Sequence, residues 1–317
     1  GNKGEAEVTL KIDTTAPQIS VSFDNNDGDT SFSDTTYFNK ARTATITIRE
    51  DNFEPARVSL LSNGASALNW SSSADNANGD GGVHKASVTF ASDGDYTFGI
   101  SCTDKAGRVS GAVDYGSSLA PMKFTVDITE PQVTVSYDNN NALNGNYYKD
   151  TRIATIQVKE HNFEVSRVNF VVTATDNGQQ AALPALSNWV TNGDTHTATV
   201  VYDKDALYTF DFDYTDKAGN KAADIPIDTF YVDMTAPKVS ITNIVDESAN
   251  SGDGNIGFSI TATDTNFDVF TPVLTAVVKE GDKFVEKQIS GGGFSNIGNG
   301  QVFTIKNVDL DGIYRIA

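Results

Sequence analysis

Residues 204–219 read KDALYTFDFDYTDKAG, and the same phrase returns at residues 92–107 as SDGDYTFGISCTDKAG. In the copy at 204–219, Phe210, Phe212 and Tyr214 alternate with aspartates. Strict alternation of apolar and polar residues indicates a β-strand with one buried face. The phrase therefore predicts a strand followed by a tight turn, and its return predicts a structure built from repeats.

Two further phrases recur in the same order along the chain. A proline-led strand phrase occurs at residues 14–26 (TTAPQISVSFDNN), 128–140 (ITEPQVTVSYDNN) and 234–244 (MTAPKVSITNI). A strand with an acidic turn occurs at residues 42–53 (RTATITIREDNF), 152–163 (RIATIQVKEHNF) and 258–267 (FSITATDTNF). The leading prolines, Pro17, Pro131 and Pro237, are spaced by 114 and then 106 residues. Several blocks in constant order predict a tandem array of domains.

The array also predicts the domain boundaries. We expect residues 1–13, GNKGEAEVTLKID, to be the terminal strand of a preceding repeat, because they resemble residues 219–233, GNKAADIPIDTFYVD. The first repeat is expected at 14–127 and the second at 128–233. The third is expected at 234–317, truncated before its last strand.

Strand-like stretches in each repeat are rich in β-branched and aromatic residues and are separated by turn residues. In the second repeat the pattern predicts strands at 132–137, 152–159, 166–173, 197–202, 208–215 and 230–233, with a short one near Trp189. About seven short strands per repeat predict an all-β fold of tandem immunoglobulin-like Greek-key β-sandwiches. Tyr96 and Tyr208 follow acidic turns, where a tyrosine hydroxyl can bond to nearby backbone and fix a corner.

Composition excludes some classes of partner. The chain has 42 acidic and 23 basic residues, a net charge of -19, which repels phosphate backbones and anionic lipid. The one cysteine, Cys102, cannot form an intramolecular disulfide, so packing must supply the stability. Because of the negative charge we expect no nucleic-acid partner. Because no apolar run of about 18 residues occurs, we expect no membrane insertion.

Catalytic patterns are not found in the sequence. The three histidines are His84, His161 and His196, and none belongs to a nucleophile–base–acid set. His84 and His196 precede matching strands, where we expect exposed side chains. The pairs at residues 37–38 and 147–148 could form an aromatic sugar platform, although core or edge packing is the favoured interpretation. We therefore expect a protein that is not an enzyme and requires no cofactor.

Two motifs carry a family resemblance that covers essentially the whole chain. The motif VD-x-T-x-P occurs at 126–131 and 232–237, and TDKAG occurs at 103–107 and 215–219. With these motifs the chain resembles the bacterial Ig-like domain tandem repeats of surface and secreted proteins. The resemblance implies an extracellular, rod-like spacer or adhesin region. The first repeat departs from the second by having Arg108 where the second has Asn220.

Acidic residues from three chain segments should meet at one pole of each sandwich, because the two loops and the linker lie at the same end in this topology. Calcium takes six to eight oxygen ligands, and the resemblance implies calcium at such junctions. The predicted metal-binding residues are Asp13, Glu50, Asn52 and Asp104 in the first repeat and Asp127, Glu160, Asn162 and Asp216 in the second. The third repeat offers Asp233, Asp264 and Asn266. The alternative is that these residues only cap turns.

Three functions remain open at the level of sequence. The first is a non-catalytic structural spacer or stalk of a bacterial cell-surface or secreted protein. The second is an adhesin module that binds a host or cell-wall glycan or protein, and the third is an accessory region of a large secreted carbohydrate-active enzyme. In each case the location is extracellular, and neighbouring repeats of the same chain are the expected partners.

Overall fold

The computed structural model describes residues 3–8, 10, 12–33, 35–63, 68–73, 82–110, 122–243, 256–288, 292–308 and 312–316. Within these residues the regular structure is β-strand, apart from two short 3-10 turns, η1 (Pro55–Arg57) and η2 (Val165–Arg167). The strands form six sheets that pair along the chain into three sandwiches. The predicted all-β class of immunoglobulin-like sandwiches is confirmed.

The first sandwich, strands β1 to β8, has two four-stranded sheets. One sheet has the order β1 (Gln18–Phe23), β3 (Arg42–Arg49), β6 (Val83–Phe90), β5 (Ser71–Ser73). The other has the order β2 (Tyr37–Phe38), β8 (Met122–Val126), β7 (Gly94–Cys102), β4 (Val58–Ser62). Successive strands repeatedly change sheets, which is the Greek-key connection that the repeat length predicts.

The second sandwich, strands β9 to β17, repeats this order. One sheet has the order β9 (Gln132–Tyr137), β11 (Arg152–Lys159), β15 (Thr195–Tyr202), β14 (Val190–Asn192). The other runs β10 (Tyr147–Tyr148), β17 (Asp228–Val232), β16 (Ala206–Tyr214), β12 (Val168–Asp176), β13 (Gln179–Gln180). Strand β10 pairs with β17 in parallel, whereas β9 pairs with β11 in the opposite sheet. Two consecutive strands, β9 and β10, therefore belong to opposite sheets of the sandwich.

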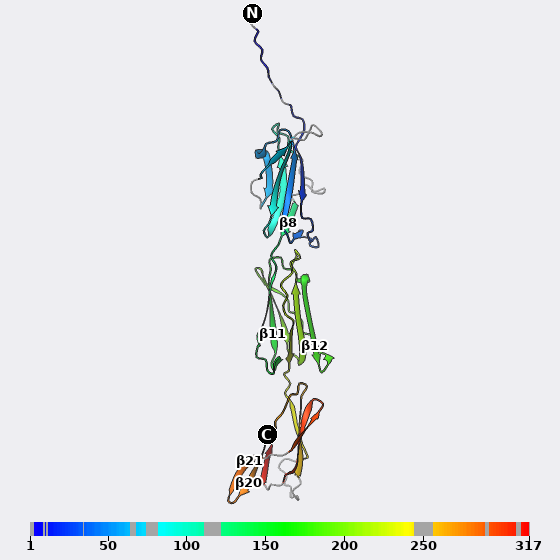
Figure 1. Ribbon diagram of the computed structural model, residues 1–317, viewed down its shortest axis with the longest axis vertical. Coiled ribbons are helices and arrows are strands. Elements are labelled where there is room, and N and C mark those ends of the chain that lie inside the picture. The colour runs from blue at the N-terminus through cyan, green and yellow to red at the C-terminus, as the bar shows by residue number, and fades with distance from the viewer. Residues whose placement is uncertain are drawn as a thin grey trace.

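The third sandwich, strands β18 to β24, has one four-stranded and one three-stranded sheet. The first runs β18 (Lys238–Thr242), β19 (Ile256–Thr263), β23 (Gly300–Val308), β22 (Gly293–Ile297). The second runs β21 (Lys283–Gln288), β20 (Leu274–Glu280), β24 (Gly312–Ile316). Figure 1 shows the hairpin β20–β21 at the side of this sandwich.

The core of the second sandwich follows the alternation seen in the sequence. Phe210, Phe212 and Tyr214 are buried, while the aspartates between them are only partly buried. Tyr202 and Phe230 come from opposite sheets and meet edge to face, with ring centroids 4.9 Å apart. Such aromatic pairs add stabilisation beyond the burial of their apolar area. The predicted tyrosine corners are also present.

Each corner is closed by a hydroxyl that donates a hydrogen bond to a backbone carbonyl. The Tyr96 hydroxyl donates to the carbonyl of Ser92 at 2.8 Å, and the Tyr208 hydroxyl donates to the carbonyl of Lys204 at 3.0 Å. Because each donor lies four residues after its acceptor, the bond fixes the turn that enters the strand.

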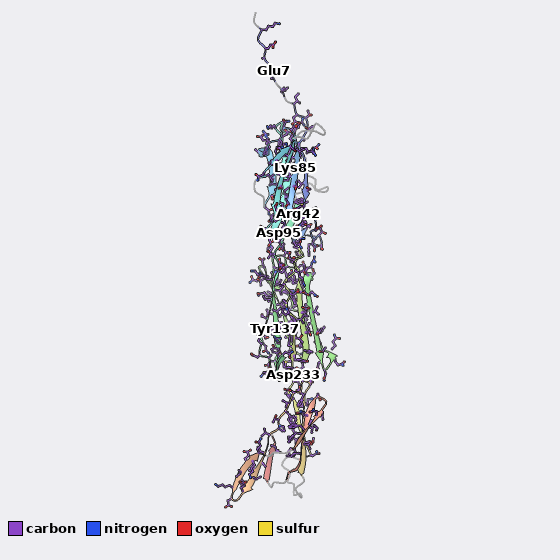
Figure 2. The ribbon with its side chains drawn as sticks, in the orientation of Figure 1. Glu7, Arg42, Lys85, Asp95, Tyr137 and Asp233 are labelled. Atoms are coloured by element: carbon purple, nitrogen blue, oxygen red, sulfur yellow. The ribbon has the colours of Figure 1, made fainter. Side chains whose placement is uncertain are left out.

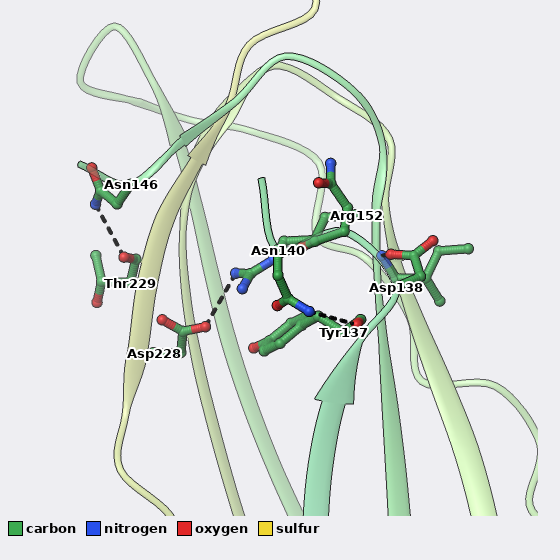
Figure 3. Close-up of polar contacts among 9 residues, drawn as sticks. Tyr137, Asp138, Asn140, Asn146, Arg152, Asp228 and Thr229 are labelled. Carbon is green, nitrogen blue, oxygen red and sulfur yellow. Dashed lines mark hydrogen bonds and ion pairs between the residues drawn. The ribbon is translucent and has the colours of Figure 1, made fainter. Parts of the chain in front are cut away.

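A buried arginine closes the same end of each of the first two cores as the tyrosine corner, and the sequence did not predict it. The Arg152 guanidinium lies 3.6 Å from the ring centroid of Tyr137, 4.1 Å from that of Tyr148 and 4.3 Å from that of Phe230. It also forms an ion pair with Asp228 at 3.2 Å (Figure 3). Arginine suits such a cage because its flat, weakly hydrated cation stacks on aromatic faces. Arg42 occupies the matching cage in the first sandwich.

The three sandwiches follow one another in line along the long axis (Figure 1). Arg42 and Asp95 lie at the end of the first sandwich that faces the second, and Asp233 lies where the second meets the third (Figure 2). The described residues before β1 form no strand, and Val8, Leu10 and Ile12 are exposed.

Candidate metal centres at the sandwich junctions

The turn that follows β11 is built around a buried glutamate. The backbone N–H of Asn162 donates to Glu160 Oε1 at 2.7 Å, so the carboxylate caps its own turn. The Glu160 N–H donates to the carbonyl of Asp194, and the Glu160 carbonyl lies 2.9 Å from Nε2 of His196. These bonds hold Glu160 at the pole of the second sandwich even though its side chain is buried.

The TDKAG phrase folds into a tight turn that presents a second buried carboxylate. Asn220 donates from its backbone N–H to Asp216 Oδ1 and from its side chain to Asp216 Oδ2, both at 2.8 Å. Gly219 has a φ of 92°, a left-handed conformation that glycine adopts without strain. The turn therefore requires a glycine at this position of the TDKAG phrase.

The linker supplies the third carboxylate. Asp127 Oδ2 accepts a hydrogen bond at 2.6 Å from the side chain of Asn162, and the Asp127 carbonyl accepts one from Asn220 at 2.8 Å. The Asp127 N–H donates to the carbonyl of Phe38 in the first sandwich. One residue is thus bonded to the sandwiches on both sides of the junction.

Together Asp127, Glu160 and Asp216 form the second acidic cluster, in which one carboxylate oxygen of each lies within 4.8 Å of the others. All three are buried. Burial raises the pKa of Glu160 to about 7 and also raises the pKa of Asp127 and of Asp216, with Asn162 or Asn220 opposing the rise through hydrogen bonds. Three buried carboxylates without a neighbouring cation are costly to ionise together.

The first sandwich carries the first acidic cluster, Asp13, Glu50 and Asp104, with the same 4.8 Å limit. Asn52 again donates to Asp13, at 2.7 Å, and its N–H to Glu50, at 2.7 Å. Burial raises the pKa of Glu50, whereas a hydrogen bond from the Thr15 backbone lowers the pKa of the partly exposed Asp13.

Asp104 differs from Asp216 in one respect. Its Oδ1 accepts a hydrogen bond from the Arg108 N–H at 2.8 Å, but its buried Oδ2 accepts none from any described residue. The Arg108 side chain turns instead to the carbonyl of Asp13, at 3.1 Å. A fully buried carboxylate oxygen without a partner is costly, and a bound cation would satisfy it.

At the third sandwich part of the pattern returns. Asn266 donates from its N–H to Asp264 Oδ1 at 2.8 Å and from its side chain to Asp233 Oδ2 at 2.9 Å. In all three sandwiches the asparagine amide thus donates to the linker aspartate and positions it.

The donor chemistry fits a calcium ion. Calcium holds oxygen ligands at about 2.3–2.6 Å, so two of its ligands lie at most about 5 Å apart, and both clusters meet that limit. Carboxylate oxygens are the ligands that hard cations prefer. When bound, the ion would neutralise charges that burial now opposes, and carbonyls or water would complete its coordination.

A crevice of about 430 Å³ opens beside the second acidic cluster. Asp93 and Asp95 of the first sandwich line one wall, and Glu160, His161 and Asp194 of the second line the other. His161 Nδ1 lies 2.9 Å from Asp194, and this contact raises the pKa of His161. The crevice gives the cluster a solvent-facing opening at the junction.

Two expectations about side chains need correction or refinement. His84 and His196 were expected to be exposed, but both are buried. They stack on Phe53 and Phe163, each with centroids 4.0 Å apart, and bond to the carbonyl before the acidic turn. Each histidine is buried because it stacks on a phenylalanine that lies more than 30 residues earlier in the chain, and a local sequence pattern does not show such a contact.

The aromatic pairs are not an exposed sugar platform. Tyr37, Phe38 and Tyr148 are buried, and Tyr147 stacks in parallel on Tyr231 with centroids 4.3 Å apart. The favoured interpretation, core and edge packing, is the one that the structure supports.

Comparison with known proteins gives limited help. No protein-family model matches the chain, and no curated protein sequence is a match. Among solved structures, the Escherichia coli adhesin FdeC is 16% identical, with 94% of this chain and 90% of that chain covered and a TM-score of 0.34. The Bacteroides ovatus protein SGBP-B, in complex with a mixed-linkage heptasaccharide, is 12% identical, with 90% and 71% covered and a TM-score of 0.15. Because both TM-scores are under 0.5, neither likeness carries a functional argument. No helix among the described residues is long and apolar enough to span a membrane.

Proposed function

We propose that this chain is a non-catalytic spacer or stalk region of a bacterial cell-surface or secreted protein, acting outside the cell. The observation that carries the proposal is the in-line order of sandwiches with linkers that have almost no free length (Figure 1). Between Val126 and Gln132, the Asp127 N–H, the Ile128 N–H and the Thr129 hydroxyl are all hydrogen-bonded to the first sandwich. A linker held in this way restricts the angle between one sandwich and the next.

The proposal includes the division of the chain into the terminal strand of a preceding repeat at 1–13, whose described residues form no strand here, and Ig-like repeats at 14–127, 128–233 and 234–317. The shared strand order of the sheets and the shared linker contacts support it. Asp205 accepts hydrogen bonds from Met234 and Thr235 in the second linker, as Asp93 does in the first. The partners of each repeat are then its neighbours in the same chain.

Calcium at the junctions is part of the same proposal. The supporting observations are the two carboxylate clusters and the unsatisfied Oδ2 of Asp104. The residues that would hold or position the ions are Asp13, Glu50, Asn52, Asp104, Asp127, Glu160, Asn162 and Asp216. Bound ions would join the linker to the sandwich that follows it.

Small-angle scattering tests the spacer. Three sandwiches of roughly 35–40 Å in line give a rod with a radius of gyration of roughly 30 Å, whereas a compact globule of this length would have about 20 Å. A value near that of the globule would contradict the proposal.

Calorimetry tests the ions separately. We expect heat on titration with calcium and a higher melting temperature in calcium than in chelator. No heat of binding, together with a melting temperature indifferent to chelator, would remove calcium from the proposal and leave the spacer untouched.

An adhesin module is the second candidate function, and the hairpin β20–β21 favours it. All of β21 is exposed, and Phe284 is 70% exposed. Exposed aromatic residues are common where proteins bind partners. A glycan array and a screen of host surface proteins, each run with Phe284→Ala as control, test this role; binding that is lost in the variant would support it, and no binding would refute it.

A further inference from the structure

A second group of contacts, which shares no residue with the acidic cluster, also joins the first two sandwiches. The loop between β1 and β2 carries Asp29 and Phe32 toward the second sandwich, and β2 begins with Tyr37 beside them. Arg167, at the end of η2, forms an ion pair with Asp29 and lies 5.4 Å from the ring centroid of Phe32. Lys217, in the TDKAG turn, completes the group, which we name the clamp.

The clamp holds Lys217 against two aromatic rings. Its ammonium nitrogen lies 5.1 Å from the ring centroid of Phe32, 5.3 Å from that of Tyr37 and 3.4 Å from the Tyr37 hydroxyl oxygen. Phe32 and Tyr37 meet edge to face, with centroids 5.5 Å apart. Cations held over aromatic faces and paired with a carboxylate resist sliding, because each contact depends on direction as well as distance.

The next junction lacks the parts of this clamp. Leu143 occupies the position of Asp29, and three residues separate it from Tyr147, whereas seven separate Asp29 from Tyr37. The shorter loop has no counterpart of Phe32. In the third sandwich the position of Arg167 is taken by Thr271, which has no cation to offer.

Both junctions nevertheless share the linker contacts. The aspartate at the corner before the penultimate strand, β7 or β16, binds the linker at each junction, through Asp93 and through Asp205. Asn162 and Asn266 bind the linker aspartate in the same way. Among the described residues, the second junction therefore shows these linker contacts without counterparts of Asp29, Phe32 and Arg167.

We propose that the clamp fixes the angle between the first and second sandwiches, and that the chain bends at the junction between the second and third. The angle at the first junction is then held by contacts on two sides, and that at the second by the linker side alone. This inference deepens the proposed spacer function, because it states where the spacer is stiff. It does not depend on bound cations.

Pairs of spin labels measure the two angles separately. Ser87, Gln157 and Ser240 are exposed strand residues, one in each sandwich, and are replaced by cysteine two at a time. Cys102 is buried, and the protein without introduced cysteines measures its background labelling. With chelator present, we expect a narrow distance distribution for the first pair of sandwiches and a broader one for the second pair.

A second experiment replaces clamp residues, two of them by the residues that hold the same positions at the second junction, and this should make the first junction more flexible. Arg167→Thr, alone and combined with Asp29→Leu and Phe32→Ala, should broaden the first distribution toward the width of the second. Arg57→Thr is the matched control, because Arg57 holds the position of Arg167 at the far pole of the first sandwich and contacts Glu54 there. The control should leave both distributions unchanged.

Four results bear on the proposal. Equal widths for the two junctions in the unmodified protein would overturn it, as would an unchanged first distribution in the triple variant with its unfolding transition intact. If the scattering curve shows a compact particle while the distance distribution at the first junction stays narrow, the spacer function is refuted and the clamp is supported. If the curve shows a rod and the clamp variants have no effect, the clamp fails and the spacer survives.

Discussion

Glu160→Gln should change the stability of the protein in opposite directions with and without calcium. Burial raises the pKa of Glu160 from 4.5 to about 7, so the folded protein favours the protonated acid. The difference between these values corresponds to roughly 3 kcal/mol at a pH above both, since one pKa unit is about 1.4 kcal/mol. Without metal, burial of Glu160 therefore does not lower the free energy of unfolding below pH 4.5, and it lowers that energy by the full amount above pH 7.

Glutamine removes the charge and keeps an oxygen that can accept the Asn162 N–H. In chelator at pH 8, Glu160→Gln should therefore raise the free energy of unfolding by up to roughly 3 kcal/mol, and the gain should vanish near pH 4.5. In saturating calcium the order should reverse, because the variant has lost a ligand that only the folded state presents.

Differential scanning calorimetry of the full chain, at several pH values and with calcium or chelator, checks both statements. Glu130→Gln is the matched control, since it makes the same change of charge at an exposed residue lining the same crevice. A variant that is less stable than the unmodified protein in chelator at pH 8 would refute the reasoning about burial. A variant that gains as much from calcium as the unmodified protein does would refute the role of Glu160 as a ligand.

Three further substitutions test the fold by chemical denaturation. Arg152→Ala should cost about 3 kcal/mol, because it empties the aromatic cage and leaves Asp228 without its partner; a change under about 1 kcal/mol would show that the cage closes without it. Tyr208→Phe should cost about 1 kcal/mol by removing the corner hydrogen bond, and an unchanged denaturation midpoint would speak against the corner. Gly107→Ala should cost about 1 kcal/mol from its φ of 87° alone, since nothing lies within 4 Å of the added carbon; a stabilised variant would contradict this.

Much of the second sandwich could be predicted from local patterns. The strands expected at 132–137 and 152–159 coincide with β9 and β11, and the short strand expected near Trp189 lies at β14. Alternation succeeds here because each strand has one face in the core and one in solvent. The two-residue strand β10 was not predicted, because a parallel pair of that length leaves no periodic pattern.

The arginine cages show what local pattern cannot supply. Arg152 begins a strand and would ordinarily be exposed, yet three rings from three other strands surround it. Its burial is decided by residues up to 78 positions away in the chain, at Phe230. The available signal was the recurrence of arginine at Arg42 and Arg152 together with aromatic residues at the matching positions.

The acidic clusters could be predicted as groups but not as individuals. Topology alone places the linker, the turn after the second core strand and the TDKAG turn at one pole, and the carboxylates meet there as expected. The sequence also showed Arg108 in place of Asn220, without indicating a consequence. In the structure Asn220 donates hydrogen bonds to both carboxylate oxygens of Asp216. The Arg108 side chain donates none to Asp104, so the buried Oδ2 of Asp104 accepts no hydrogen bond from a described residue.

This one substitution gives the two clusters different requirements for a cation. At the second cluster an ion gains from three buried carboxylates, but it must compete with the side-chain amide of Asn220 for Asp216 Oδ2. At the first, the buried Asp104 Oδ2 has no hydrogen-bond donor among the described residues, while the Arg108 guanidinium, bonded to the carbonyl of Asp13, repels a second positive charge. Charge therefore favours binding at the second cluster, and ligand availability favours it at the first, so two repeats with nearly the same motif need not bind an ion with the same affinity.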